Sequence, residues 1–169
     1  MNSELISKKL SDQLELIKNF CIQNGETIAT AESVTSGAIQ FMLSTAKEAQ
    51  QIYQGGITVY NSAQKAIHLN ADPVYAEKVK GVSSELSTQL ARSACMLFRS
   101  QIGIGITGFA TPVPEEGINE VLAYVSITRN GELLVNEKLV PQSKGPAAQW
   151  EFAEATLQRL ATILSNTKH

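Results

Sequence analysis

The sequence has few cysteines and no long apolar runs, and each shortage excludes a class of protein. Its 169 residues include two cysteines, Cys21 and Cys95, which stand in apolar helical patterns without CxxC spacing. This usage predicts buried free thiols in a reducing compartment rather than a disulfide framework. Residues 1–9 lack the apolar core of a signal peptide, and no apolar run approaches the roughly 20 residues of a membrane span. We therefore expect a cytoplasmic protein without a membrane partner.

Basic residues are also scarce. Lysine and arginine together number 14 against 16 acidic residues, which gives a formal charge of −2, and no dense basic cluster is present. Proteins that bind nucleic acids usually carry a basic stripe. We therefore expect no nucleic-acid partner, whereas a small phosphorylated ligand stays compatible with this charge.

The remaining composition is that of a globular protein, with 43% hydrophobic and 18% charged residues. A chain of this length can bury a normal core, so residues 1–169 are predicted to form one domain. Apolar periodicity and turn residues predict the elements of that domain. The predicted elements are a helix ending at 24–25, strand 27–31, helix 38–44, strand 56–60, helices 61–69 and 72–81, a helix ending near 100, strands 102–106, 121–128 and 133–140, and a last helix after 144–146.

The order of these elements predicts the fold class. It favours an α/β fold, namely a single-domain three-layer α/β/α sandwich with a mixed sheet. Two glycines within the strand 102–106 indicate close backbone approach at that strand. Asn130-Gly131 is typical of a type I′ hairpin turn. The segment Thr107–Asn119 is predicted to be the longest loop, and long loops in small domains are often functional.

Three polar residues are candidates for chemistry at one edge of the predicted sheet. Ser33 follows the first predicted strand, Tyr60 ends the second, and Lys65 lies in the first turn of the next helix. In open α/β sheets, ligands bind at the carboxyl ends of the strands. A lysine kept neutral can act as the base for a serine nucleophile, and both burial and a helix N-terminus lower the pKa of a lysine. Each residue also has an ordinary alternative: a helix cap for Ser33, a solvated amine for Lys65 and a packed aromatic for Tyr60.

Other catalytic motifs are missing from the sequence. It contains no HxH, HExxH, CxxC or Walker motif, and Gly103, Gly105 and Gly108 do not have GxGxxG spacing. Glu32, Asp72 and Glu115 do not form a recognisable pair of carboxylates. We therefore expect neither a metal nor a cofactor.

Four motifs resemble those of a known family. The segment Ala31–Gly37 (AESVTSG) resembles the AESCTGG motif of the CinA C-terminal domain family of competence/damage-inducible proteins, and Gly55–Lys65 resembles its GGVVAYSNEAK. Gly81–Ser83 resembles GAVS, and Thr107–Ala110 resembles TGIAG. The motifs occur in the same order and span nearly the whole chain. That family includes nicotinamide-nucleotide amidohydrolases, also called NMN deamidases.

The resemblance implies an activity and a set of site residues. It implies hydrolysis of nicotinamide mononucleotide (NMN) to nicotinate mononucleotide and ammonia, with Ser33 as nucleophile, Lys65 as base and Tyr60 assisting proton transfer. Backbone amides of the turn from Ser33 to Gly37 would stabilise the oxyanion. The residues expected to bind substrate are Thr35, Ser36, Gly37, Thr107, Gly108 and Lys144.

The sequence also departs from the family pattern where the substrate would bind. Ser36 replaces a glycine, the loop after Gly108 carries bulkier residues, and Lys144 stands near the last helix where the family usually has arginines. Two alternatives therefore stay open beside NMN hydrolysis. One is an amidohydrolase for another small amide, and the other is a catalytically silent domain that binds a small molecule or serves as an oligomeric scaffold. A homo-oligomer is expected in each case.

Overall fold

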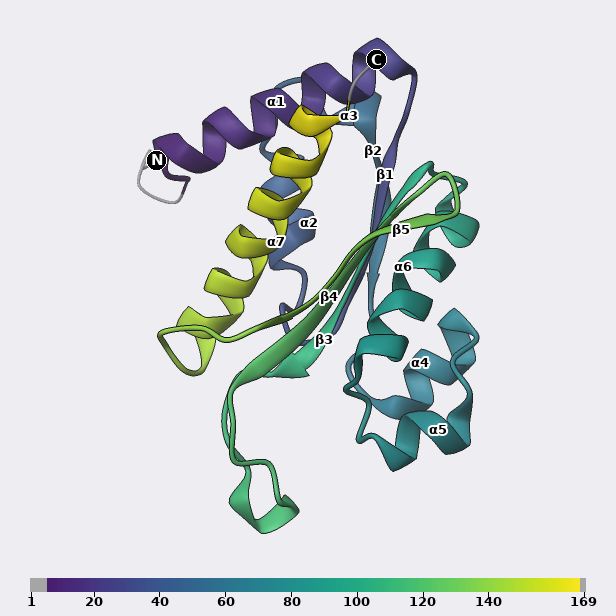
Figure 1. Cartoon of the computed structure of the whole chain (residues 1–169), viewed down its shortest axis with the longest axis vertical. Helices are drawn as coiled ribbons and strands as arrows, with labels where there is room; N and C mark the ends of the chain where they lie inside the picture. Colours follow the sequence, from purple (N-terminus) through teal and green to yellow (C-terminus); the bar gives the residue numbers. More distant parts are fainter. Residues whose placement is uncertain (1–5, 168–169) are drawn as a thin grey trace.

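A computed structural model describes residues 6–167, in which one mixed sheet of five strands lies between two layers of helices (Figure 1). The strands are β1 Ile28–Glu32, β2 Tyr53–Thr58, β3 Ile102–Phe109, β4 Leu122–Arg129 and β5 Glu132–Leu139. Their order in the sheet is β2-β1-β3-β4-β5; β1 pairs in parallel with β2 and β3, and the other pairs are antiparallel. The helices are α1 Lys8–Asn24, α2 Ala38–Ser44, α3 Ala49–Ile52, α4 Ser62–Leu69, α5 Pro73–Lys78, α6 Ser84–Phe98 and α7 Pro146–Asn166, with a 3₁₀ turn, η1, at Pro114–Glu116.

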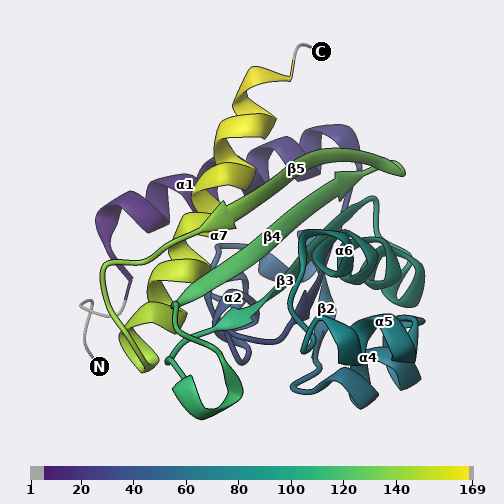
Figure 2. The same cartoon turned by 60° about the horizontal axis from the view of Figure 1, so that its bottom comes forward.

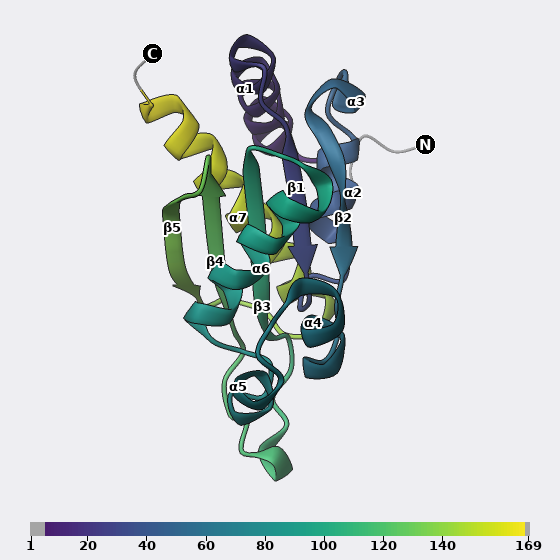
Figure 3. The same ribbon diagram turned by 90° about the vertical axis from the view of Figure 1, so that its right-hand side faces the viewer.

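The helices divide between the two faces of the sheet. Helices α1, α2 and α7 cover one face, and α6 covers the other, with α4 and α5 beside it (Figures 1 and 3). This arrangement confirms the predicted three-layer α/β/α sandwich with a mixed sheet. Within residues 6–167, no helix has both the length and the apolar character that a membrane crossing requires.

Alternation along β3 sets how closely each layer approaches the sheet. Ile102, Ile104 and Ile106 are fully buried in the core on the α1 and α7 side. Gly103 and Gly105 face α6, where a Cβ atom at either position would overlap backbone atoms of that helix. Helix α6 therefore packs directly on the β3 backbone, which confirms the close approach predicted from the two glycines.

The second strand differs from its prediction. It spans 53–58 rather than 56–60, so Tyr60 lies two residues beyond the strand instead of ending it. Gly55 and Gly56 lie inside the strand, and a Cβ at Gly56 would overlap the Thr30 side chain of β1. Glycine is required there by the close packing of the two strands, a condition that sequence position alone does not reveal. The short helix α3 just before this strand was not predicted.

The third strand is longer than expected. It continues to Phe109, so Thr107 and Gly108 belong to β3 and not to the loop. The connection to β4 spans 110–121 and contains η1 together with an isolated bridge between Val113 and Ile118. In Figures 1 and 3 this loop extends beyond the end of the sheet.

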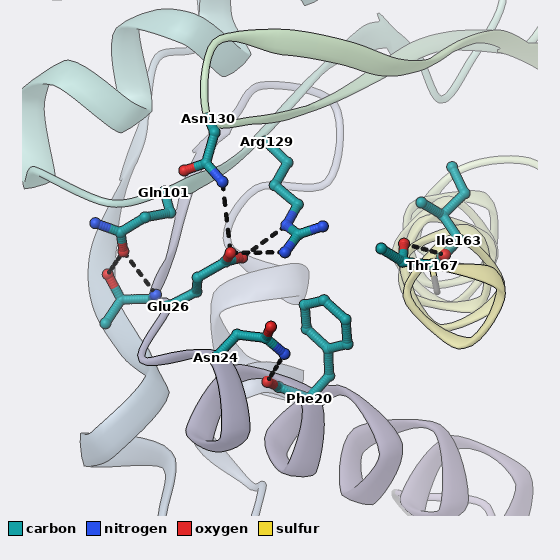
Figure 4. A network of polar contacts seen from close by, with 9 residues as sticks. Phe20, Asn24, Glu26, Gln101, Arg129, Asn130, Ile163 and Thr167 are labelled. Carbon is teal, nitrogen blue, oxygen red and sulfur yellow. Dashed lines mark hydrogen bonds and ion pairs between the residues drawn. The ribbon is translucent and has the colours of Figure 1, made fainter. Parts of the chain in front are cut away.

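The opposite end of the sheet is held by the β4–β5 hairpin and a polar cluster. Asn130 and Gly131 have φ values of 51° and 86°, as a type I′ turn requires. The Arg129 guanidinium binds the Glu26 carboxylate through two bonds of 2.8 and 2.7 Å and lies over the ring of Phe20 (Figure 4). The bidentate pair ties the hairpin to the chain between α1 and β1.

Candidate active site

The candidate site lies where the carboxyl ends of β1 and β3 meet, the end of the sheet turned toward the viewer in Figure 2. The chain leaves β1 toward β2 on one side and leaves β3 toward β4 on the other, and such a reversal is where open α/β sheets bind ligands. Ser33 directly follows β1, and its amide donates a hydrogen bond of 3.1 Å to the carbonyl of Ile106 in β3. The backbone of Ser33 is thereby fixed to the neighbouring strand.

A buried carboxylate organises the turn that follows Ser33. Glu32 is fully buried, and its oxygens accept hydrogen bonds from the Thr35 hydroxyl at 2.6 Å and from the amides of Gly37, Ile39 and Gln40 at 3.1, 3.1 and 2.8 Å. Three of these donors are backbone amides at the N-terminus of α2, where a negative charge is favourable. Glu32 was not predicted to have this role. From the sequence, Glu32 was weighed only as a member of a carboxylate pair with Asp72 or Glu115, and no such pair was recognised.

Lys65 lies against Ser33 in the interior. Its side chain is 2% exposed, and Nζ donates a hydrogen bond of 2.9 Å to Ser33 Oγ. Asn61 caps the N-terminus of α4 and thereby starts the helix that carries Lys65. Gly81 lies over the amine, because a Cβ at that position would be 3.3 Å from Nζ.

Burial changes the acidity of this lysine. Removal from water disfavours the ammonium form, and it lowers the pKa of Lys65 from 10.5 to about 8. No carboxylate among residues 6–167 forms an ion pair with Nζ to oppose this effect. Lys65 therefore has the two properties that the base of a serine nucleophile needs, contact and access to the neutral state.

Ser33 and Lys65 line a cleft of about 500 Å³. Its walls come from the turn after β1, the start of α4 and the residues just before it, the turn between α5 and α6, the end of β3, the loop 110–121 and the start of α7. The lining residues are Ser33, Val34, Tyr60, Asn61, Ser62, Lys65, Lys80, Val82, Gly108, Phe109, Ala110, Thr111, Val113, Glu116 and Gln149.

The remaining predicted catalytic residue lies at the rim of the cleft. Tyr60 is 75% exposed, and its hydroxyl makes no hydrogen bond to any residue that the structure describes. The structure thus brings Ser33 and Lys65 together, while Tyr60 lines the same cleft without contacting either polar group.

Two residues that were predicted to bind substrate use their hydroxyl groups in hydrogen bonds within the protein. The Thr35 hydroxyl is used by Glu32, and the fully buried Thr107 donates a hydrogen bond of 2.6 Å from its hydroxyl to the carbonyl of Gly81. Gly108 does line the cleft, but a Cβ there would overlap β4, so strand packing already explains the glycine.

The other three lie beside the cleft and not in its lining. Ser36 is exposed with a left-handed φ of 50°, and Gly37 follows with a φ of 96°. Ser36 therefore adopts the backbone conformation that the glycine of the family motif favours, and its Cβ does not enter the cleft. Lys144 is exposed, and its neighbour Gly145 binds the carbonyl of Ala110 at 2.7 Å.

Two residues of the cleft lining were not predicted as site residues. Lys80, in the turn after α5, contacts the backbone carbonyl of Glu116 across the mouth of the cleft. Gln149 of α7 donates from Nε2 to the carbonyl of Val34 at 2.8 Å and to Ser36 Oγ at 3.3 Å. Both reach the site through tertiary packing, and no local pattern marks either one. Across residues 6–167, no three histidine, cysteine, aspartate or glutamate side chains are grouped so that they could hold a metal ion.

Comparison with known proteins gives a consistent result. The family model of the CinA C-terminal domain matches residues 11–164. A Bacillus velezensis protein named as competence-damage inducible is 33% identical over 129 residues, which are 75% of this chain and 31% of that protein. A Bacillus subtilis protein of the same name is 31% identical over 129 residues, with the same coverage of 75% and 31%. The chain thus spans about a third of the length of these relatives.

Solved structures of the same superfamily share the fold. A CinA superfamily protein from Enterobacter cloacae has a TM-score of 0.86 at 20% identity, over 97% of this chain and 96% of that one. The competence/damage inducible protein CihA from Agrobacterium tumefaciens has a TM-score of 0.83 at 20% identity, over 94% and 97% of the two chains. With its motifs, its sheet and the match over residues 11–164, this chain belongs to the CinA C-terminal domain family.

Proposed function

We propose that this chain is an amidohydrolase in which Ser33 is the nucleophile and Lys65 the general base, with the carboxamide of NMN as its first candidate substrate. The observation that carries the proposal is the 2.9 Å contact between Ser33 Oγ and a buried amine whose pKa burial lowers to about 8. A serine beside a base in a ligand-sized cleft is the arrangement that nucleophilic catalysis requires.

The first step forms the bond between serine and substrate. Neutral Lys65 accepts the proton of the Ser33 hydroxyl while Oγ attacks the carboxamide carbon, and the carbonyl π electrons move to oxygen. The distance of 2.9 Å between Nζ and Oγ suits this transfer, because the proton can pass from Oγ to Nζ directly along one hydrogen bond. Lys65 then carries the proton as an ammonium.

Two backbone amides are available for the oxyanion. The turn from Ser33 to Gly37 was predicted to stabilise the oxyanion. In this turn, the amides of Ser33, Ser36 and Gly37 already donate hydrogen bonds to other groups of the protein. The amides of Val34 and Thr35 have no hydrogen-bond partner among the described residues, and Val34 lines the cleft. We assign the oxyanion to these two amides, directly after the nucleophile.

The second half of the reaction returns the proton. As the carbon–nitrogen bond breaks, the Lys65 ammonium protonates the departing nitrogen, and ammonia leaves. Neutral Lys65 then takes a proton from water, whose oxygen attacks the acyl carbon, and Ser33 is reprotonated as the acid is released. Tyr60 can assist these transfers only after its exposed side chain turns inward over bound substrate.

Two structural features favour an enzyme over a catalytically silent domain. A Lys65 amine directed to solvent, or a loop filling the space at Ser33, would favour the silent alternative. Instead the amine is buried on Ser33, and the loop 110–121 lines an open cleft. An amidohydrolase for a different small amide uses the same two residues and stays as the second candidate.

The test is ammonia release from NMN by purified protein, beside the variants Ser33→Ala and Lys65→Met. Each variant is expected to lose activity by about a thousandfold or more. Ser165→Ala, which removes an exposed hydroxyl near the end of α7, is the matched control and is expected to keep full activity. Activity that survives in both site variants would contradict the mechanism. Failure of the unmodified chain on NMN and on related amides would favour the silent domain.

A further inference from the structure

The cleft is larger than a reacting amide alone requires. A volume of about 500 Å³ is typical of sites that hold a whole small-molecule ligand. The carboxamide fills only the part beside Ser33 and Lys65, so the remaining walls contact the rest of the substrate. Apart from Lys65, the charged residues of the lining are Lys80 and Glu116.

Lys80 presents a positive charge that no carboxylate neutralises. Its exposed amine contacts the backbone carbonyl of Glu116 and forms no ion pair within residues 6–167. An ammonium has three donors, and a single carbonyl uses one of them. The amine also lies close to Gly117, 3.8 Å from where a Cβ would stand.

The backbone of Lys80 is fixed relative to the catalytic pair. Its neighbour Gly81 packs over Lys65 Nζ, donates its amide to the carbonyl of Ala76 at 2.7 Å and accepts a hydrogen bond from Thr107 at 2.6 Å. Lys80 and Gly81 have left-handed φ values of 53° and 71°, and the two hydrogen bonds of Gly81 restrain this backbone conformation. Because Lys80 and Ser33 also line the same cleft, one ligand can lie with its amide at Ser33 and another group at Lys80.

We propose that Lys80 is the specificity-determining residue that binds an anionic group of the substrate, remote from the amide. The inference rests on the proposed amidohydrolase function and adds to it the residue that binds the anion, which is a phosphate or a carboxylate. Lysine binds either anion as a point charge, and such charge-assisted hydrogen bonds are stronger than neutral ones. Lys144, which the sequence suggested for this role, is not in the cleft lining.

The kinetic test compares two amides that differ by one phosphate. Lys80→Gln is expected to raise KM for NMN about tenfold and to leave kcat nearly unchanged. It is expected to leave kcat/KM unchanged for nicotinamide riboside, which has the same amide without the phosphate. Lys80→Arg should restore KM. Equal effects on both substrates, or none on NMN, would overturn the proposal.

Two further lysine variants complete this test. Lys78→Gln removes an exposed charge two residues away that does not line the cleft, and it is expected to have no effect. Lys144→Gln tests the competing position. A rise in KM for NMN in Lys144→Gln without one in Lys80→Gln would assign the anion to Lys144 and overturn the proposal.

A binding test separates this inference from turnover. Titration of isotope-labelled protein with inorganic phosphate, followed by NMR, is expected to shift the amide signals of Lys80, Gly81 and Gly117, and Lys80→Gln should abolish the shifts. A parallel titration with sodium acetate distinguishes a carboxylate from a phosphate site. Such binding without amide hydrolysis would support the anion site while contradicting the proposed function. Absence of shifts with both anions would overturn the anion site whatever the activity.

Discussion

At the scale of single residues, the central feature is Lys65, a buried lysine that has no ion-pair partner in the part of the chain that the structure describes. Lys18, the other buried lysine among residues 6–167, pairs with Glu15 at 2.6 Å and with Glu48 at 3.7 Å. Lys65 instead faces an uncharged hydroxyl. With a pKa of about 8, about one Lys65 in ten is neutral at pH 7, against about one in three thousand at the ordinary 10.5. The difference is large enough to decide whether Ser33 has a base.

The lowered pKa of Lys65 predicts the pH dependence of the proposed reaction. Because the proposed mechanism needs neutral Lys65, kcat/KM is expected to rise with pH to a plateau, with an apparent pKa of about 8. The measurement is the kcat/KM for NMN from pH 6 to 10, with the stability of the protein checked at each pH. A profile that is flat between pH 6 and 9, or one that rises only near 10.5, would contradict the assignment of Lys65 as base.

At the scale of elements, the fold was predictable where its signals are local. The caps Asn61 and Asp72 mark helix starts and accept the expected backbone hydrogen bonds, and Asn130-Gly131 forms the predicted turn. The bounds of β2 were wrong because Gly55 packs against Phe98 of α6 and Gly56 against Thr30 of β1, contacts that local sequence does not show.

The site divides in the same way. Motif resemblance identified Ser33 and Lys65, which the structure places in contact. The roles of Glu32, Lys80 and Gln149 depend on segments that meet only in the folded chain, so the sequence analysis did not find them.

The contact between α6 and β3 leads to a prediction about these two elements. In Gly105→Ala the new Cβ would overlap backbone atoms of Ser87 and Ala91, which cannot rotate away, so α6 must shift. We expect the free energy of unfolding to fall by about 1–3 kcal/mol in urea titrations. Gly131→Ala is the control, because it meets no atom within 4 Å and costs about 1–2 kcal/mol through its positive φ alone. A Gly105→Ala protein as stable as the unmodified chain would show that α6 is not seated directly on β3.

At the scale of the whole molecule, the two ends of the sheet differ in whether a buried charged group has an ion-pair partner. At the hairpin end, the Glu26 carboxylate is neutralised by the bidentate Arg129. At the end with the candidate site, Lys65 is buried and forms no ion pair with any residue from 6 to 167. Breaking a buried pair leaves an uncompensated charge and destabilises the fold, whereas removing an unpaired buried charge relieves a cost. Burial of the unpaired Lys65 therefore lowers the free energy of unfolding at the end of the sheet that holds the candidate site.

The last prediction concerns global stability and its sign with pH. The pKa of Lys65 is about 8 in the folded protein and 10.5 in its ordinary state, so the unfolded chain binds the proton more tightly. The free energy of unfolding is therefore expected to increase as the pH rises from about 8 to 10.5. Below pH 8 the lowered pKa of Lys65 reduces the free energy of unfolding by as much as about 3 kcal/mol. Lys65→Met is thus expected to unfold at higher urea concentration than the unmodified chain at pH 7, with a smaller difference at pH 10.

The ion-paired lysine supplies the control. Lys18→Met is expected to bring no such gain at pH 7, because its ammonium is compensated by Glu15. If Lys65→Met were less stable than the unmodified chain at both pH 7 and pH 10, then Lys65 would contribute to folding through its hydrogen bond to Ser33 more than its burial costs. In that case burial would not disfavour the ammonium enough to supply the neutral amine that general-base catalysis requires.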